Sequence, residues 1–213
     1  MSRPITRTAG APLEFETVID AARELIREHG FEALTMRRLA ADCGVTAMSL
    51  YRHVRTKEEL LVILADRLLD DLNVPIDADQ SPADQVAAVF RALYRMWRAH
   101  PEFGLIAASQ PVDGKVAHRW LEVVLAALSR AGLDPAQSVD AYDALACYTA
   151  GFLQQHAGRK QDAVPEAERI ARINDSSSEF PHVLAAADQL VSRSDEKYFD
   201  AGLRIVLRGV FDG

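Results

Sequence analysis

Residues 34–61 read LTMRRLAADCGVTAMSLYRHVRTKEELL, and this stretch indicates the fold of the N-terminal part of the chain. Thr35 and Thr46 each stand directly before a short helical pattern, where a hydroxyl oxygen caps a helix N-terminus well. Gly44 lies between the two patterns and supplies a tight turn. Two short capped helices joined by a glycine turn form a helix-turn-helix, predicted here with helices at 36–43 and 47–53.

The segments on either side of this motif complete a three-helix domain. Before it, apolar residues recur at helical spacing over 14–29, and Gly30 follows at the position of a C-terminal cap. After it, Thr56 opens a helix predicted over about 57–73, and Glu59 completes a capping box. The core of this domain is predicted from the residues on the inward faces: Leu39, Ala40, Cys43, Val45, Leu50 and Val54.

Charge is distributed unevenly along the chain, although the net charge is −7. Residues 1–57 carry nine Lys and Arg against seven Asp and Glu, whereas residues 58–213 carry fifteen against twenty-four. Within 33–57, five basic residues stand against a single acidic one, Asp42. A local basic face is sufficient for DNA binding, because phosphates are neutralised locally. A solvated helix face without a DNA partner explains the same charges.

In a helix-turn-helix, the first residues of the second helix meet base edges in the major groove. Arg37, on the preceding helix, is long enough to form a bidentate pair with guanine. The predicted DNA-binding residues are Thr35, Arg37, Thr46, Ala47, Met48, Ser49, Tyr51, Arg52, His53 and Lys57. A helical hairpin that binds no DNA remains an alternative for this pattern.

The same run resembles the DNA-binding domain of the TetR family of bacterial repressors, over about residues 15–65. The resemblance implies that Arg37 reads a base. It also implies that Ala47 stands at a base-reading polar position, where it cannot donate a hydrogen bond and touches a thymine methyl group instead. The residues implied to contact the DNA backbone are Tyr51, His53 and Lys57. Arg3 and Arg7 belong to a tail that we interpret as disordered rather than as a minor-groove arm.

The C-terminal half reads as helices at about 82–99, 101–109, 114–131, 135–156, 181–192 and 195–211, with a loop at 158–180 that holds one short helix. The helices at 135–156 and 195–211 are apolar around a wider arc than one neighbour covers. This favours a subunit interface over a fully buried core. The half resembles the ligand-binding domain of the tetracycline-repressor branch, in which the corresponding helices form a four-helix bundle across a two-fold axis.

The fold is therefore predicted to be all-α. A helix-turn-helix domain at 14–60 precedes a larger helical ligand-binding and dimerisation domain at 61–213, and the helix at about 57–73 connects them. Side chains between the C-terminal helices are candidates for a ligand pocket, although most such aromatic residues belong to a core. These candidates are Tyr94, Phe103, Ile106, Trp120, Tyr148, Phe152 and Gln155.

We expect no cofactor, no catalytic site and no metal site. The spacing of His100, His118 and His156 does not fit a metal-binding pair, and Cys43 and Cys147 fit no redox motif. Motifs for nucleophilic, phosphate-binding or zinc chemistry are missing, which makes an enzyme the weaker hypothesis. The resemblance places Ile106 and Gln155 where tetracycline repressors hold the magnesium–drug complex with histidine and glutamate, so we expect no binding of that complex.

These observations predict a ligand-responsive transcriptional regulator that binds a palindromic DNA operator as a homodimer and is released by a small molecule. Residues 1–16 contain no apolar block, so we expect no signal peptide. No run approaches the roughly 18 apolar residues that span a membrane, so we expect no membrane association. The two distant cysteines favour a reduced, cytoplasmic compartment. A transcriptional activator and a helical protein-binding module without operator activity are the alternatives.

Overall fold

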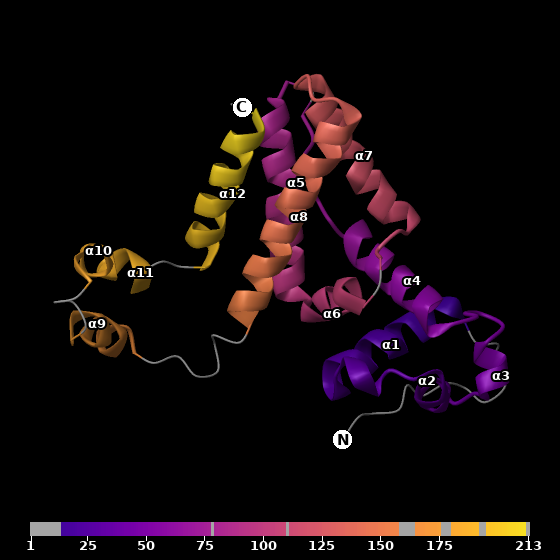
Figure 1. Ribbon diagram of the computed structural model, residues 1–213. Helices are drawn as coiled ribbons and strands as arrows, with labels where there is room; N and C mark the ends of the chain where they lie inside the picture. The colour runs from indigo at the N-terminus through magenta and orange to yellow at the C-terminus, as the bar shows by residue number, and fades with distance from the viewer. Residues whose placement is uncertain are drawn as a thin grey trace. The chain divides into compact units, whose positions relative to one another are not determined.

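The computed structural model describes residues 14–77, 79–109, 111–157, 165–175, 180–191 and 195–211, and every regular element within these ranges is a helix (Figure 1). The all-α prediction is therefore confirmed. Contacts group the chain into two compact units: unit 1 comprises Met1–Val74 and Arg95–Val123, and unit 2 comprises Pro75–Tyr94 and Val124–Gly213. Helices α5 (Pro82–Ala99) and α7 (Lys115–Arg130) contribute to both units.

The domain boundary predicted at residue 60 stays a prediction, and the unit that contains the helix-turn-helix extends beyond it. The predicted tail with Arg3 and Arg7 lies outside the described residues. Along the described ranges, no helix combines the length and the apolar composition that crossing a bilayer requires.

Helix α1 (Phe15–His29) forms the base of unit 1. Its apolar residues recur every three or four positions, so they share one face, and packing that face stabilises the helix. A glycine at its end, Gly30, has a φ of +84°, which is unfavourable for any residue with a Cβ. A 3₁₀ turn that was not predicted, η1 (Phe31–Ala33), follows. The buried residues of α1 are Val18, Ile19, Ala21, Ala22, Leu25 and Ile26.

The helix-turn-helix consists of α2 (Met36–Asp42) and α3 (Ala47–Leu50), as predicted. Thr35 Oγ1 accepts a hydrogen bond from Arg38 N at 3.2 Å, and Thr46 Oγ1 accepts one from Ser49 N at 3.2 Å. Gly44 has a φ of +66°, as the tight turn requires. Of the predicted core, Leu39, Ala40, Cys43, Leu50 and Val54 are buried and Val45 is half-buried.

Helix α4 (Lys57–Asp70) also begins as predicted, because Thr56 Oγ1 accepts a hydrogen bond from Glu59 N at 3.0 Å. The reciprocal bond differs from a standard capping box. Glu59 Oε2 accepts from Arg55 N at 2.7 Å, one residue before the cap.

Two helix ends were predicted three residues too late. Helix α3 ends at Leu50 rather than at residue 53, because Arg52 N and His53 N bond three residues back, as in His53 N to Leu50 O at 2.9 Å. Helix α4 ends at Asp70 rather than at residue 73. Leu72 N bonds to Leu69 O in the same three-residue manner, and Pro75 disfavours a helical residue before it.

The remainder of unit 1 contains α6 (Pro101–Ser109), the end of α5 and the first half of α7. Helix α6 packs against α4 and buries Phe103 and Ile106. Trp97 of α5 lies edge-to-face on Phe103, with ring centroids 5.4 Å apart. Gly104 of α6 is needed there, because a Cβ at this position would overlap the indole of Trp97.

Unit 2 is built around α8 (Pro135–Ala157) and α12 (Asp195–Phe211), which pack against each other. Completely or almost completely buried side chains from α5, α8 and α12 fill its core: Phe90, Tyr94, Leu145, Phe199 and Leu203. An ion pair on the side of the core joins α5 to α12, with Arg91 Nε donating to Asp200 Oδ1 at 2.7 Å.

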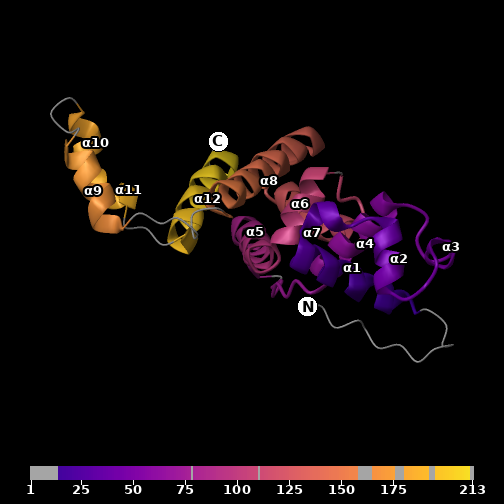
Figure 2. The same ribbon diagram turned by 90° about the horizontal axis from the view of Figure 1, so that it is seen from below.

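Three short helices form a separate cluster in unit 2: α9 (Glu166–Asp175), α10 (Pro181–Ala185) and α11 (Ala187–Val191) (Figure 2). Helix α9 confirms the one short helix predicted within 158–180. The single helix predicted at 181–192 is instead interrupted at Ala186, whose φ of −102° and ψ of 2° are not helical.

Candidate DNA-binding surface and ligand-binding residues

Helix α3 directs one large side chain inward and leaves the others toward solvent. Leu50 is completely buried, whereas Met48 is 74% exposed. Ala47 and Ser49 are half-buried, and Thr46 is exposed with its hydroxyl oxygen engaged in the cap. The outward face of α3 therefore combines a large apolar side chain with hydroxyl groups that keep a proton to donate.

The cations near this face differ in what they contact. Arg37 and Arg52 are exposed, and no ion pair or side-chain hydrogen bond involves either of them among the described residues. Arg55 Nε lies 3.5 Å from Glu59 Oε2, and Lys57 Nζ lies 5.0 Å from the ring centroid of Phe31. The exposed guanidinium groups of Arg37 and Arg52 are thus available for an anionic partner. Two further predicted contacts, Tyr51 and His53, are exposed and half-buried respectively.

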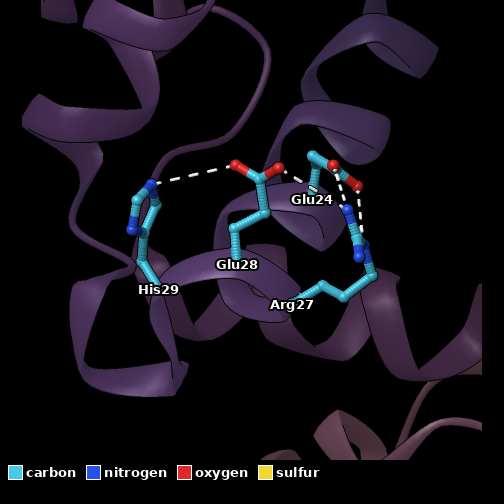
Figure 3. A network of polar contacts seen from close by, with 4 residues as sticks. All are labelled: Glu24, Arg27, Glu28 and His29. Atoms are coloured by element: carbon cyan, nitrogen blue, oxygen red, sulfur yellow. Dashed lines mark hydrogen bonds and ion pairs between the residues drawn. The ribbon is translucent and has the colours of Figure 1, made fainter. Parts of the chain in front are cut away.

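The end of α1 shows cationic charge that is compensated within the protein (Figure 3). Arg27 Nε donates to Glu24 Oε2 at 2.9 Å, and a second guanidinium nitrogen contacts the other carboxylate oxygen. Glu28 adds contacts at 3.6 Å to Arg27 and at 3.9 Å to His29. The hydrogen bond from Arg27 lowers the pKa of the Glu24 carboxyl, so this pair stays ionised. Among the described residues, Arg27 is therefore neutralised within the protein, unlike Arg37 and Arg52.

Within unit 1, a side chain of each of the helices α4 and α7 forms hydrogen bonds to the backbone near an end of the other helix. We call this region, residues 66–70 and 114–120, the α4–α7 joint. The carboxylate of Asp66 accepts hydrogen bonds from Val116 N at 3.2 Å and from Ala117 N at 3.1 Å. It therefore caps the N-terminus of α7 from another helix. Gly114 permits this approach, because a Cβ there would overlap the carboxylate.

The joint is completed by contacts in the opposite direction. Trp120 Nε1 donates to the carbonyl oxygen of Leu69 at 2.9 Å, near the C-terminal end of α4. Arg119 Nη2 pairs with Asp70 Oδ1 at 2.9 Å. Sequence reasoning missed Asp66, because its partners lie about fifty residues away; the weak signal was Gly114 at a helix start without a capping side chain.

The predicted ligand-binding residues fall into both units. Phe103, Ile106 and Trp120 belong to unit 1, where the first two are buried and the third is half-buried. Tyr94, Tyr148, Phe152 and Gln155 belong to unit 2.

In unit 2, three of these residues come together around Phe199 of α12. Tyr94 stacks on Phe199 with ring centroids 4.1 Å apart, and Phe152 meets Tyr94 edge-on at 5.9 Å. Tyr148 donates its hydroxyl hydrogen to Phe199 O at 2.8 Å. Burial raises the pKa of Tyr148 to about 12, and the neighbouring Tyr198 adds to the shift. Phe199 was predicted only as part of an apolar helix and not as the centre of this cluster.

At the end of α8, the ligand candidate Gln155 and its neighbour His156 differ in exposure. Gln155 is exposed and borders an open hollow together with Gly151 and Gln154. His156 is buried, stacks on Phe152 at 3.9 Å between ring centroids, and has Nδ1 2.7 Å from Phe152 O. This histidine is therefore a packed and hydrogen-bonded core residue.

Both helices of the predicted subunit interface keep apolar groups exposed. On α12, Ile205 is 70% exposed, although Phe199, Leu203 and Leu207 of the same helix are buried. On α8, Val139 is 49% exposed. Each of the two helices thus keeps an apolar side chain that unit 2 does not cover.

Two family models match the chain. The model described as "Bacterial regulatory proteins, tetR family" matches residues 18–63, and the model described as "Tetracyclin repressor-like, C-terminal domain" matches residues 74–212. The first match contains the helix-turn-helix. The second contains the ligand candidates and both helices of the predicted subunit interface, α8 and α12.

Similar proteins include regulators and solved structures. The HTH-type transcriptional repressor DrrR1 of Streptomyces coeruleorubidus is 30% identical, over 93% of this chain and 77% of its own length. The class D tetracycline repressor protein of Escherichia coli is 29% identical, over 93% and 89%. The crystal structure of apo ActR from Streptomyces coelicolor has a TM-score of 0.84 and 27% identity, covering 96% of this chain and 98% of ActR. ActR has also been solved in complex with actinorhodin, with a TM-score of 0.82.

Proposed function

This chain belongs to the TetR family of bacterial regulatory proteins, and we propose that it represses transcription by occupying a palindromic operator until a small molecule releases it. One observation supports this proposal most strongly. The capped helix-turn-helix that matches the family holds Arg37 and Arg52 exposed and without an acidic partner among the described residues. Free cations beside a reading helix are the arrangement that phosphates and guanine edges require.

The proposed roles follow from position. Arg37 reads a guanine from α2, while the residues Thr46 to Ser49 face base edges from α3. Tyr51, Arg52, His53 and Lys57, together with Thr35, position the protein on the phosphate backbone. Lys57 does so from a place over the Phe31 ring, which orients its ammonium group.

The protein acts on double-stranded DNA as a homodimer, and we propose that α8 and α12 form the interface. Support comes from the exposed apolar groups on these helices, including Ile205 and Val139. Covering them with a second copy removes apolar surface from water. A two-fold axis also places two recognition helices about 34 Å apart, which matches successive major grooves of a palindrome.

Release is proposed to work as a population shift. ActR has been solved with actinorhodin and with (S)-DNPA, which supports a small-molecule effector for this relative. The effector must bind the released geometry more tightly than the DNA-bound one. Trp120, a ligand candidate, donates a hydrogen bond to the backbone at the end of α4. An effector that moves its indole therefore shifts α4, the helix that directly follows the helix-turn-helix.

We propose that the effector is not magnesium–tetracycline. Ile106 is completely buried and apolar, and Gln155 is an uncharged amide, so neither side chain ligates Mg²⁺ as a histidine or a carboxylate does. Isothermal calorimetry with the preformed complex is expected to show no heat of binding at micromolar concentrations. Micromolar binding would contradict the assignment of these two positions.

The proposed activity is binding alone, with no catalytic step, and it takes place in the cytoplasm, where a bacterial operator is accessible. The test is fluorescence anisotropy with the intergenic DNA upstream of the gene, across a salt series. We expect tight binding that resists scrambled competitor DNA and weakens steeply with salt. Arg37→Ala should lose the preference for the operator, whereas Arg27→Ala should retain it, since Arg27 is paired with Glu24. Weak binding that ignores sequence would count against the proposal.

A further inference from the structure

Met48 holds the largest apolar side chain that α3 leaves to solvent. At 74%, it is the most exposed large hydrophobic residue in the described part of the chain. Its neighbour Leu50, two positions on, is completely buried and already anchors the helix. Met48 therefore adds little to the stability of the free protein, and an apolar group in this position gains favourable free energy only when a partner covers it.

The polar groups around Met48 restrict what that partner can be. Helix α3 (Ala47–Leu50) carries no amide, carboxylate or guanidinium side chain, so it cannot form a bidentate hydrogen-bonded pair with a base. Thr46 has its oxygen engaged in the helix cap, and Ala47 has no polar atom in its side chain. Met48 is thus the longest and most exposed side chain on α3.

The major groove offers one prominent apolar group, the C5-methyl group of thymine. A methionine thioether is flexible and polarizable, so it adapts its shape to such a group. Arg37 and Arg52, exposed and without an ion pair among the described residues, precede and follow α3 closely in the chain, which favours a polyanion over an apolar protein surface as the occupant.

We infer that Met48 reads a thymine in each operator half-site by covering its C5-methyl group, beside the base read by Arg37. The inference rests on the proposed function and specifies the operator that it needs. Two helices then recognise the bases in different ways: Arg37 on α2 forms hydrogen bonds, and Met48 on α3 makes apolar contact. The operator half-site then contains an indispensable thymine methyl group.

The test begins with selection of bound fragments from random double-stranded DNA by the purified full-length protein. Each thymine of the selected operator is then replaced by deoxyuridine, in both half-sites at once, which removes the methyl group and keeps the base pair. At one thymine position the uracil duplex should bind about fourfold more weakly per half-site, hence about 15-fold for both. Met48→Ala should bind the thymine and uracil duplexes equally.

Two controls separate this reading from a general loss of affinity. Arg37→Ala should weaken binding to both duplexes and preserve their ratio. Thermal unfolding of Met48→Ala should match that of the wild type, because the side chain is exposed. An enriched operator whose uracil duplexes all bind like the parent would overturn this inference alone, as would a thymine preference that survives in Met48→Ala. A selection that enriches no sequence would overturn the proposed function and this inference together.

Discussion

The indole nitrogen of Trp120 lies 2.9 Å from the carbonyl oxygen of Leu69, so a side chain of α7 bonds to the backbone at the end of α4. The same carbonyl oxygen also accepts from Leu72 N at 3.2 Å. Asp66 caps α7 in return, from one turn earlier on α4. Each helix therefore supplies a hydrogen-bonding group to an end of the other, and the two are held in one register.

Replacing Trp120 with Phe should lower the free energy of unfolding by about 1 kcal/mol, because it removes the donor and keeps an aromatic ring. The loss stays small since Leu69 O retains its bond from Leu72 N. Urea unfolding followed by circular dichroism measures the change. Trp120→Ala, which also removes the ring, should cost clearly more; equal losses would show that the hydrogen bond carries the whole contribution of this side chain.

Replacing Asp66 with Ala should cost about 1 kcal/mol, the usual loss for a helix cap. Asp66→Asn should retain part of the stability, because an amide oxygen still accepts from Val116 N and Ala117 N. Asp70→Ala is the matched control on the same helix, since its pair with Arg119 is half exposed and worth little. If the two alanine variants unfold at the same urea concentration, the capping role of Asp66 is refuted.

Replacing Arg52 with Ala should weaken DNA binding by a similar factor on operator and on unrelated DNA, because a phosphate contact carries no sequence information. The slope of log affinity against log salt should become shallower by about 0.9. Arg27→Ala should leave that slope unchanged, since Glu24 already neutralises Arg27 (Figure 3). A reduced slope in Arg27→Ala as well would mean that the paired end of α1 also contacts DNA.

The half-buried hydroxyl of Tyr148 predicts a loss of stability in alkali. Its pKa is raised from the ordinary value of 10.0 to about 12, so the folded protein holds this proton more tightly than the unfolded chain does. The corresponding stability is fully present below pH 10 and is lost as the pH rises from 10 to 12. Urea midpoints measured across this range should fall for the wild type and fall less for Tyr148→Phe. The pKa of Tyr142 is also raised by burial, so part of the dependence should remain in the variant.

Local signals in the sequence were sufficient for most of unit 1. Three threonines cap the helices that follow them, and the glycines at 30 and 44 have the positive φ values that their positions suggested. These features depend on neighbours within a few residues, so a single stretch of sequence contains all their partners.

Contacts between distant segments were not predictable in the same way. Asp66 reads as one of several acidic residues on α4 until its bonds to the start of α7 are seen. Tyr94, Tyr148 and Phe152 were predicted as ligand candidates, but their packing around Phe199, which lies on α12, was not predicted. Helix ends were also misplaced, as at Leu50, because three-residue hydrogen bonds leave little trace in the spacing of apolar residues.

Within its four residues, helix α3 assigns packing and solvent-facing roles to different side chains. Leu50 anchors the helix in the core and Thr46 caps its N-terminus, while Met48 is largely exposed to solvent. If the proposed reading by Met48 holds, substitutions at this exposed position should change operator preference with little cost to the stability of the fold. After gene duplication, two copies could diverge rapidly in the genes that they control. An engineer could retarget the protein by exchanging the same few codons and leaving the scaffold untouched.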